Sequence, residues 1–133
     1  MSVQQLAFYQ EKLTWQIDSW DLYVALNNGE KIVVVDGRGA ESFEKEHIPG
    51  AINIPHRTIC ENALLHLDKS ALYVTYCDGI GCNGSTKTAL KMLTLGFRVK
   101  EMLGGLDWWK RDGYATLGSH GRDGTTVQCG CQG

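Results

Sequence analysis

Hydrophobic residues recur along the chain with two different periods, and the pattern predicts strands that alternate with helices. Lys31–Asp36 and Leu72–Cys77 are short apolar runs rich in β-branched or aromatic residues, which is typical of strands buried on both faces of a parallel sheet. Weaker strands are expected at residues 13–17, 51–55 and 98–103. Helices are expected at residues 2–11, 19–26, 40–46, 85–97 and 107–111, with a helical turn or two between 61 and 67. Ser2 is expected to cap the first helix and either Asp18 or Ser19 the second, and Gly104-Gly105 is expected to form a turn. This alternation indicates an α/β domain with a mainly parallel sheet.

The segment Leu72–Phe97 combines a strand, a glycine-containing loop and a helix. The strand ends at Cys77, and the loop runs from Asp78 to Gly84. A helix that begins near Ser85 directs its first N–H groups, and the positive end of its dipole, toward such a loop. A cysteine held there is expected to be more acidic than a free thiol. Cys77 is therefore predicted to be a reactive thiolate rather than an inert core cysteine.

The helix that follows the loop has an apolar face and a polar face. The apolar face is expected to hold Ala89, Leu90, Met92, Leu93 and Phe97, and the polar face Lys87, Lys91 and Thr94. Ser85 and Thr86 are expected mainly to cap this helix. The cations Lys87, Lys91 and Arg98 either attract anionic sulfur compounds or simply solvate an exposed surface.

Composition and charge restrict the class of protein. The 133 residues suffice for one domain with its own core, and a formal net charge of -2 does not favour binding to nucleic acid or a membrane surface. No apolar run approaches the roughly 20 residues of a membrane helix, and the first residues do not resemble a signal peptide. Five unevenly spaced cysteines do not form a disulfide scaffold. The expected compartment is the reducing cytoplasm, where thiols are more often catalytic or metal-binding.

Several short motifs, in their order and spacing, resemble the single-domain rhodanese (sulfurtransferase) family. They are Val34–Arg38, His47–Pro55, Tyr76-Cys77, Leu95-Gly-Phe97 and Leu103–Trp108. The resemblance spans residues 13–114, leaving an N-terminal helical extension over 1–12 and a glycine-rich tail over 115–133. It implies a sheet of about five mainly parallel strands flanked by helices on both faces. It also implies a cysteine that carries sulfane sulfur as a persulfide, from a donor such as thiosulfate to a thiol, cyanide or protein acceptor.

The loop after Cys77 departs from the family pattern. Rhodaneses commonly have a shorter loop, usually with an arginine, whereas here seven residues separate Cys77 from Ser85 and none of them is basic. Phosphatase relatives of the fold have a similarly lengthened loop. A cysteine phosphatase or arsenate reductase is therefore an alternative, although a phosphoryl group normally requires an arginine in its cradle.

Cys82 lies inside the same loop and has three open roles. It can be a resolving thiol that closes a disulfide with Cys77, a second sulfur acceptor, or the nucleophile itself. Cys77 and Cys82 are thus the candidate catalytic residues. The candidate substrate-binding residues are the rest of the loop and the start of the helix: Asp78, Gly79, Ile80, Gly81, Asn83, Gly84 and Ser85. Asp78 is expected either to point away from Cys77 or to cap the loop, because a carboxylate beside a thiolate would raise the thiol pKa.

Other polar and aromatic residues have less specific expectations. Asp36 and Arg38 are expected to form a buried ion pair that also binds loop N–H groups. His56 and Arg57 follow a strand end, from which they can reach the mouth of the pocket. At most one of Trp108 and Trp109 faces the site, because neighbouring helical residues point about 100° apart. The spacing of Cys129-Gly-Cys131 is too short for a usual zinc half-site. No metal or cofactor is expected.

The leading function is sulfur transfer through a cysteine persulfide. A different class of function is a non-catalytic sulfur carrier or redox sensor, in which Cys77 and Cys82 form a disulfide switch. The sequence does not separate a slow enzyme from a carrier, because both use the same persulfide.

Overall fold

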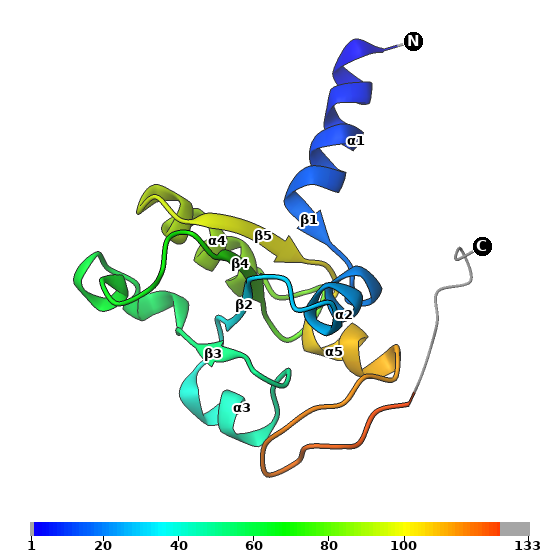
Figure 1. Ribbon diagram of the computed structural model, residues 1–133, viewed down its shortest axis with the longest axis vertical. Coiled ribbons are helices and arrows are strands. Elements are labelled where there is room, and N and C mark those ends of the chain that lie inside the picture. Colours follow the sequence, from blue (N-terminus) through cyan, green and yellow to red (C-terminus); the bar gives the residue numbers. More distant parts are fainter. Residues whose placement is uncertain (1, 126–133) are drawn as a thin grey trace.

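A sheet of five parallel strands lies at the centre of the computed structural model, which describes residues 2–125 (Figure 1). The strands are β1 (Gln16–Ile17), β2 (Ile32–Asp36), β3 (Ile52–Asn53), β4 (Leu72–Tyr76) and β5 (Arg98–Met102). Their order in the sheet is β1-β5-β4-β2-β3, and every neighbouring pair runs parallel. The predicted α/β fold with a parallel sheet is confirmed.

The central strands are those that the sequence predicted most strongly. β2 and β4 pair along their whole length, with Val34 opposite Val74, and both of these residues are buried. Branched side chains favour such a position, because they pack well on both faces of a pleated sheet. The carboxyl ends of β2 and β4 therefore meet at one edge of the sheet, where Cys77 follows directly.

Helices cover both faces of the sheet. On one face, Leu22 of α2 (Ser19–Asn27) and Trp109 of α5 (Gly105–Arg111) join the core around Val34. On the other face, Met92 of α4 (Gly84–Thr94) packs in the core around Val35. The remaining helical elements are α3 (Ala40–Lys45) and the single 3₁₀ turns η1 (His56–Thr58) and η2 (Asn62–Leu64). Within residues 2–125 no helix is long and apolar enough to span a bilayer.

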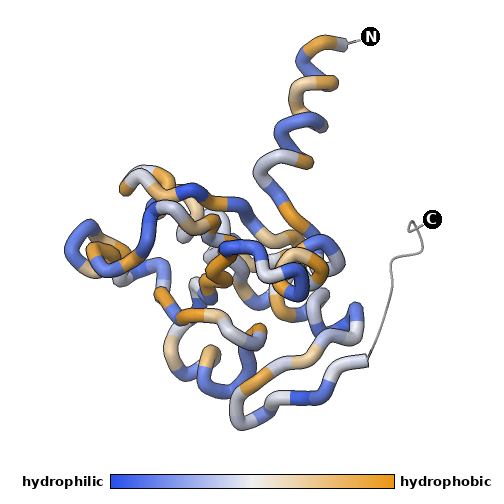
Figure 2. Tube along the Cα trace, in the orientation of Figure 1, coloured by the Kyte–Doolittle hydropathy of each residue, from blue (hydrophilic) through white to orange (hydrophobic). Residues whose placement is uncertain are grey.

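The first helix is longer than predicted. α1 covers Val3–Trp15, so the strand expected at residues 13–17 is reduced to Gln16–Ile17. Ser2 caps the helix as expected, its hydroxyl accepting a hydrogen bond from the Gln5 N–H at 3.1 Å. Glu11, Lys12 and Leu13 are good helix formers, and propensity decides here because α1 buries no residue. The helix projects from the domain (Figure 1), and its hydrophobic residues lie along this projection (Figure 2).

The buried face of α4 also differs from the prediction. Leu90 and Leu93, expected in the core, are exposed, whereas Ser85, Thr88 and Met92 are buried. The residues that face the sheet follow the i, i+3, i+7 spacing from Ser85, and two of them are hydroxyl residues. Thr88 is satisfied by donating to the Gly84 carbonyl oxygen at 2.8 Å. Met92 and Phe97 are buried and Ala89 packs against the core, as predicted, so the apolar pattern identified part of the buried face and missed its hydroxyl residues.

Residues 115–125 are irregular, as expected, and lie against the domain. Thr116 is buried, its hydroxyl donates to the Glu46 carboxylate at 2.6 Å, and the Leu117 backbone pairs with that of His47. Trp109 donates its indole N–H to the Ala115 carbonyl oxygen at 2.9 Å. The tail cysteines Cys129 and Cys131 lie outside the described residues.

Candidate active site

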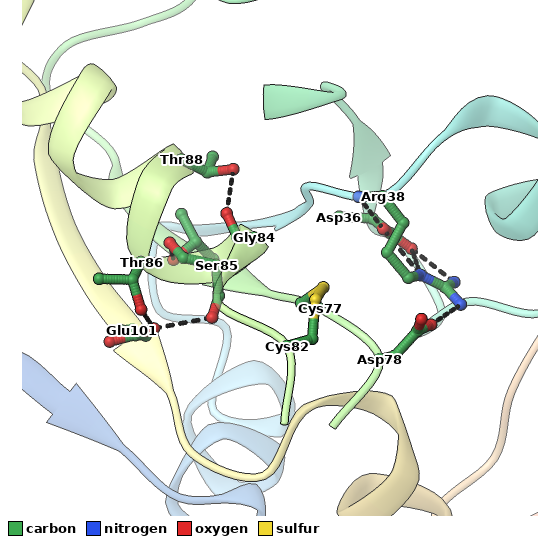
Figure 3. Close-up of a disulfide and its surroundings, with 11 residues drawn as sticks. Asp36, Arg38, Cys77, Asp78, Cys82, Gly84, Ser85, Thr86, Thr88 and Glu101 are labelled. Atoms are coloured by element: carbon green, nitrogen blue, oxygen red, sulfur yellow. Dashed lines mark hydrogen bonds and ion pairs between the residues drawn. A yellow bond between two sulfur atoms is a disulfide. The ribbon is translucent and has the colours of Figure 1, made fainter. Parts of the chain in front are cut away.

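The two cysteines of the loop form a disulfide. Cys77 follows the last residue of β4, and the loop then turns back so that only Asn83 separates Cys82 from α4. The Cα atoms of the two cysteines are 6.1 Å apart (Figure 3). Cys77 is buried, with only 4% of its surface exposed, whereas Cys82 is partly exposed. Of the three roles open for Cys82, closing a disulfide with Cys77 is the one that this state of the protein displays.

The amino end of α4 lies directly beside the sulfur of Cys77. A Cβ atom added to Gly84 would lie 2.9 Å from the Cys77 Sγ and 3.5 Å from the Cys82 Sγ. The N–H groups of Gly84, Ser85 and Thr86 have no acceptor within residues 2–125, as is usual for the first turn of a helix. These free donors and the helix dipole favour negative charge on a sulfur held there.

The start of α5 holds the loop in place. The N–H groups of Leu106 and Asp107 donate to the carbonyl oxygens of Cys77 and Asp78, at 2.9 and 2.8 Å. This approach requires the glycine turn before them, because Gly105 has a φ of 61° and a Cβ there would lie 2.5 Å from the Cys77 carbonyl oxygen. The predicted Gly104-Gly105 turn therefore allows the start of α5 to hydrogen-bond the backbone of the loop at Cys77 and Asp78.

The Asp78 side chain points away from the sulfurs, as predicted. Its carboxylate accepts a hydrogen bond from Arg38 at 3.0 Å (Figure 3). Arg38 also binds the buried carboxylate of Asp36, which accepts a further hydrogen bond from the Tyr76 hydroxyl at 2.7 Å. The expected buried ion pair is therefore confirmed, including its backbone contact, since the Arg38 N–H donates to Asp36 at 2.9 Å.

This network is strongly coupled in charge. Burial and the neighbouring Asp36 carboxylate raise the pKa of Tyr76, so its hydroxyl stays protonated and donates. Burial alone would lower the pKa of Arg38, but hydrogen bonds to Asp36 and the charge of that carboxylate raise it above its ordinary value. Arg38 is thus a permanent cation whose donors are engaged by Asp36, Asp78 and the Glu46 carbonyl oxygen. Through its ion pair with Asp78, Arg38 holds the first residue of the loop in place.

Ser85 and Thr86 do not cap α4, contrary to the prediction. Asn83 occupies the cap position and makes no side-chain cap hydrogen bond. The hydroxyls of Ser85 and Thr86 donate instead to one oxygen of Glu101, at 2.7 and 2.6 Å (Figure 3). Because Ser85 and Thr86 lie inside the first turn of α4, past the cap position at Asn83, their hydroxyls bind the Glu101 carboxylate of the neighbouring strand β5 instead of a backbone N–H. Glu101 joins β5 to the first turn of α4.

A cleft of about 570 Å³ opens on the Cys82 side of the loop. Among its walls are most of the predicted substrate-binding residues: Gly79, Ile80, Gly81, Asn83 and Ser85. Asp78 lines a cavity beside Arg38 and a more open hollow that shares Gly79, Ile80, Gly81 and Cys82 with the cleft, and Gly84 packs against the sulfurs. The structure therefore gathers the predicted residues around the disulfide, with Asp78 as the residue that points elsewhere.

The cations considered for attracting anions are divided. Arg98 is the first residue of β5, at the edge of the sheet opposite the loop, and donates to the Ser70 carbonyl oxygen. Its predicted role beside the site is wrong. Lys87 and Lys91 lie near His56, whose pKa is lowered by burial and by the charges of these lysines and Arg57. Neither the three cations Lys87, Lys91 and Arg98 nor His56 and Arg57 line the cleft.

Residues from other elements complete the cleft, and several of them were not among the predicted site residues. They include Asp18 before α2, Glu101 in β5, Leu103 directly after β5 and Asp112 after α5. Of the two tryptophans, Trp109 is in the core and Trp108 faces the cleft, as the helical geometry required. Glu101 carried one usable signal, because it lies near the carboxyl end of a predicted parallel strand, where ligands bind in such folds.

Comparison with known families agrees with this geometry. The model of the rhodanese-like domain family matches residues 19–112, which includes β2–β5, the disulfide loop and α5. The chain belongs to the rhodanese-like family. The resemblance inferred from the short motifs is therefore confirmed.

Solved structures support the same assignment. A crystal structure of a protein from Bacillus halodurans is 38% identical, with a TM-score of 0.85, and covers 96% of this rhodanese-like chain and 93% of that one. The rhodanese-like domain of an Anabaena protein, solved by NMR, is 27% identical with a TM-score of 0.70, covering 89% and 94%. An uncharacterized protein of Buchnera aphidicola is 31% identical over 93 residues, which is 67% of this chain. The chain spans 62% of the length of that relative.

Proposed function

We propose that this rhodanese-like protein is a sulfurtransferase that carries sulfane sulfur on Cys77. The observation that carries the proposal is the position of the Cys77 sulfur at the carboxyl edge of the sheet, against the first turn of α4. Free N–H donors there stabilise a thiolate, which is the nucleophilic form, and equally the terminal anion of a persulfide. Family membership makes this chemistry the first to test.

The reaction begins after reduction of the Cys77–Cys82 disulfide. The Cys77 thiolate attacks the outer sulfur of a donor such as thiosulfate, the sulfur–sulfur bond of the donor breaks, and sulfite leaves with the electron pair. An acceptor, either a thiolate or cyanide, then attacks the outer sulfur of the persulfide and the Cys77 thiolate is released. No side-chain base is required, because the thiolate is stabilised by main-chain donors. A reducing compartment such as the cytoplasm would keep the loop open for this cycle.

The disulfide itself favours a second candidate, a redox module that opens and closes without turnover. When an external disulfide forms a mixed disulfide with Cys77, Cys82 is placed to attack the Cys77 sulfur, release the external thiolate and close the loop, which a purely persulfide-carrying domain does not need. The phosphatase alternative has less support. The loop contains no arginine, and Arg38 is engaged with Asp36 and Asp78.

The test is mass spectrometry of the reduced protein after exposure to thiosulfate. We expect an adduct with the mass of one sulfur atom on Cys77, lost in Cys77→Ser and retained in Cys82→Ser, together with multiple turnover to cyanide. Cys60→Ser is the matched control, because Cys60 is an exposed free thiol outside the loop. Retention of adduct and activity in Cys77→Ser, with loss in Cys82→Ser, would assign the nucleophile to Cys82. Reversible disulfide formation with no adduct would leave the redox module as the function.

A further inference from the structure

The cleft beside the loop exposes one sulfur of the disulfide and shields the other. Cys82 lines the cleft, whereas Cys77 is buried and does not. A thiolate that enters the cleft therefore meets the Cys82 sulfur first. Attack there forms a bond between the entering sulfur and Cys82, breaks the bond to Cys77, and releases Cys77 as a thiolate beside the first turn of α4. That position favours a leaving thiolate, and better leaving thiolates speed the exchange.

The charge of the cleft is uniformly negative. Its ionisable side chains are Asp18, Glu101 and Asp112, and no lysine, arginine or histidine lines it. Arg111 packs over Trp108, with its guanidinium 5.7 Å from the ring centroid, but it pairs with Asp107 at 3.0 Å and lines a neighbouring cavity rather than this cleft. The charged side chains that line the cleft around the Cys82 sulfur are therefore carboxylates.

The rest of the cleft is apolar. Ile80, Met102, Leu103 and Trp108 contribute to its walls. Such a wall does not replace the hydration of an anion, so an anionic ligand would lose solvation without gaining a partner. A cationic molecule also loses hydration but gains the carboxylates as partners, and a small uncharged molecule has less hydration to lose.

We propose that the thiol that opens the Cys77–Cys82 disulfide, and that takes sulfur from this site, is a small thiol without negative charge and preferably with a positive one. The inference rests on the proposed function for the sulfur-accepting step only. The disulfide-opening step stands independently, because it needs no sulfane sulfur. In that step two thiols are oxidised to one external disulfide, and the protein disulfide is reduced to two thiols.

The experiment measures how fast three small thiols reduce the disulfide of the full chain. The thiols are cysteamine, mercaptoethanol and mercaptoacetate, which carry a positive, a neutral and a negative group. Samples are quenched by alkylation, and peptide mapping gives the redox state of Cys77 and Cys82. Each rate is divided by the rate of the same thiol with a small uncharged disulfide, which removes differences in thiol pKa and intrinsic nucleophilicity.

We expect the normalised rates to fall in the order cysteamine, mercaptoethanol, mercaptoacetate. The span, which is the ratio of the cysteamine rate to the mercaptoacetate rate, should be about tenfold at low salt and smaller at high salt. Asp112→Asn should narrow the span by about twofold, and the combined Asp18→Asn, Glu101→Gln and Asp112→Asn protein should nearly abolish it. Asparagine can still cap α2, and glutamine can still accept from Ser85 and Thr86. Asp112 is the cleanest single change, because its side chain makes no hydrogen bond or ion pair within residues 2–125.

The matched control is Glu41→Gln, which changes the net charge by the same amount on exposed α3, away from the cleft. It should leave the span unchanged. Equal normalised rates for the three thiols, or a span that Glu41→Gln reduces as much as Asp112→Asn, would overturn the proposal. Neither outcome would affect the sulfur-loading test of Cys77. A failed loading test with a preserved charge preference would remove the sulfurtransferase and keep the cleft as the entry for a reducing thiol.

Discussion

At the scale of single residues, the absence of a side chain at Gly84 sets the space beside the Cys77 Sγ. It is buried at the start of α4, and a side chain there would approach the Cys77 Sγ to 2.9 Å, closer than real Cβ atoms are found. Gly81, three residues earlier in the same loop, has open space where its Cβ would be and no positive φ. The two glycines therefore allow the space beside the sulfur to be tested separately from loop flexibility.

Gly84→Ala should slow sulfur loading of Cys77 by about tenfold or more, because a small displacement of a reacting atom has a large effect on rate. The cost in stability should be about 1 to 3 kcal/mol from overpacking. Gly81→Ala should leave both quantities nearly unchanged. Loading rates come from mass spectrometry of the reduced proteins, and stabilities from urea unfolding. Equal loading rates in the two variants would mean that the persulfide does not form beside Gly84.

At the scale of elements, the segment after α5 is attached to the domain by backbone hydrogen bonds to Glu44, Lys45 and His47 and by the side chain of Glu46. This carboxylate, at the end of α3, accepts from the Thr116 hydroxyl at 2.6 Å and pairs with Lys110 at 2.8 Å and Arg122 at 3.6 Å. Burial alone would raise the pKa of Glu46, but the hydrogen bonds from Lys110 and Thr116 and the nearby positive charges lower it. Residues 115–125 thus have no regular secondary structure, but Thr116 and Arg122 bind the Glu46 carboxylate.

The lowered pKa of Glu46 predicts the pH dependence of this attachment. A carboxyl group whose pKa is lower in the folded state stabilises the fold above its unfolded pKa, near 4.5. That contribution is lost as the pH falls through the folded value. Glu46→Gln should lower the free energy of unfolding by about 1 to 3 kcal/mol at neutral pH, and the difference should shrink below about pH 4.5. Urea unfolding between pH 3 and 7 measures it, with exposed Glu41→Gln as control. A difference that does not vary with pH would argue against an ionised Glu46.

At the scale of the whole molecule, the parallel sheet brings distant segments to one edge. The disulfide loop follows β4, Arg38 follows β2, Glu101 lies near the end of β5, and the start of α5 binds the loop backbone. Charges of opposite sign lie in different places around this edge. The carboxylates Asp18, Glu101 and Asp112 line the cleft, whereas the cations around His56 do not line it. Opening the disulfide releases one constraint on this assembly.

Reduction of the Cys77–Cys82 disulfide should lower the stability of the whole domain by about 2 kcal/mol, since it closes a short loop in the unfolded chain. The measurement is urea unfolding of the oxidised and the reduced protein. Cys82→Ser, which cannot form the bond, should unfold at the same urea concentration under both conditions. A reduced protein that is at least as stable as the oxidised one would show that the native loop prefers the thiols, and that the disulfide is the more reactive form.

The sequence by itself determined the elements that have strong local signals. The branched run of β2, the strand that ends at Cys77, the Asp18 cap of α2 and the Gly104-Gly105 turn all form where their residues predict. It also determined the family, through short motifs in a regular order, and the identity of the loop that holds both cysteines. In each case the cause is local, because β-branched strands, side-chain caps and positive-φ glycines depend on neighbours in the chain.

Only the tertiary structure decided which partner each polar side chain takes. Ser85 and Thr86 resemble helix caps in the sequence, but α4 begins before them at Gly84 and β5 brings Glu101 within reach of their hydroxyls. Leu90 and Leu93 look like core residues until the sheet selects the face of Thr88 and Met92. The acidic wall of the cleft is assembled from α2, β5 and α5, which no sequence spacing connects. Charge and contact at this site depend on distances in space, and those are set by how the elements pack.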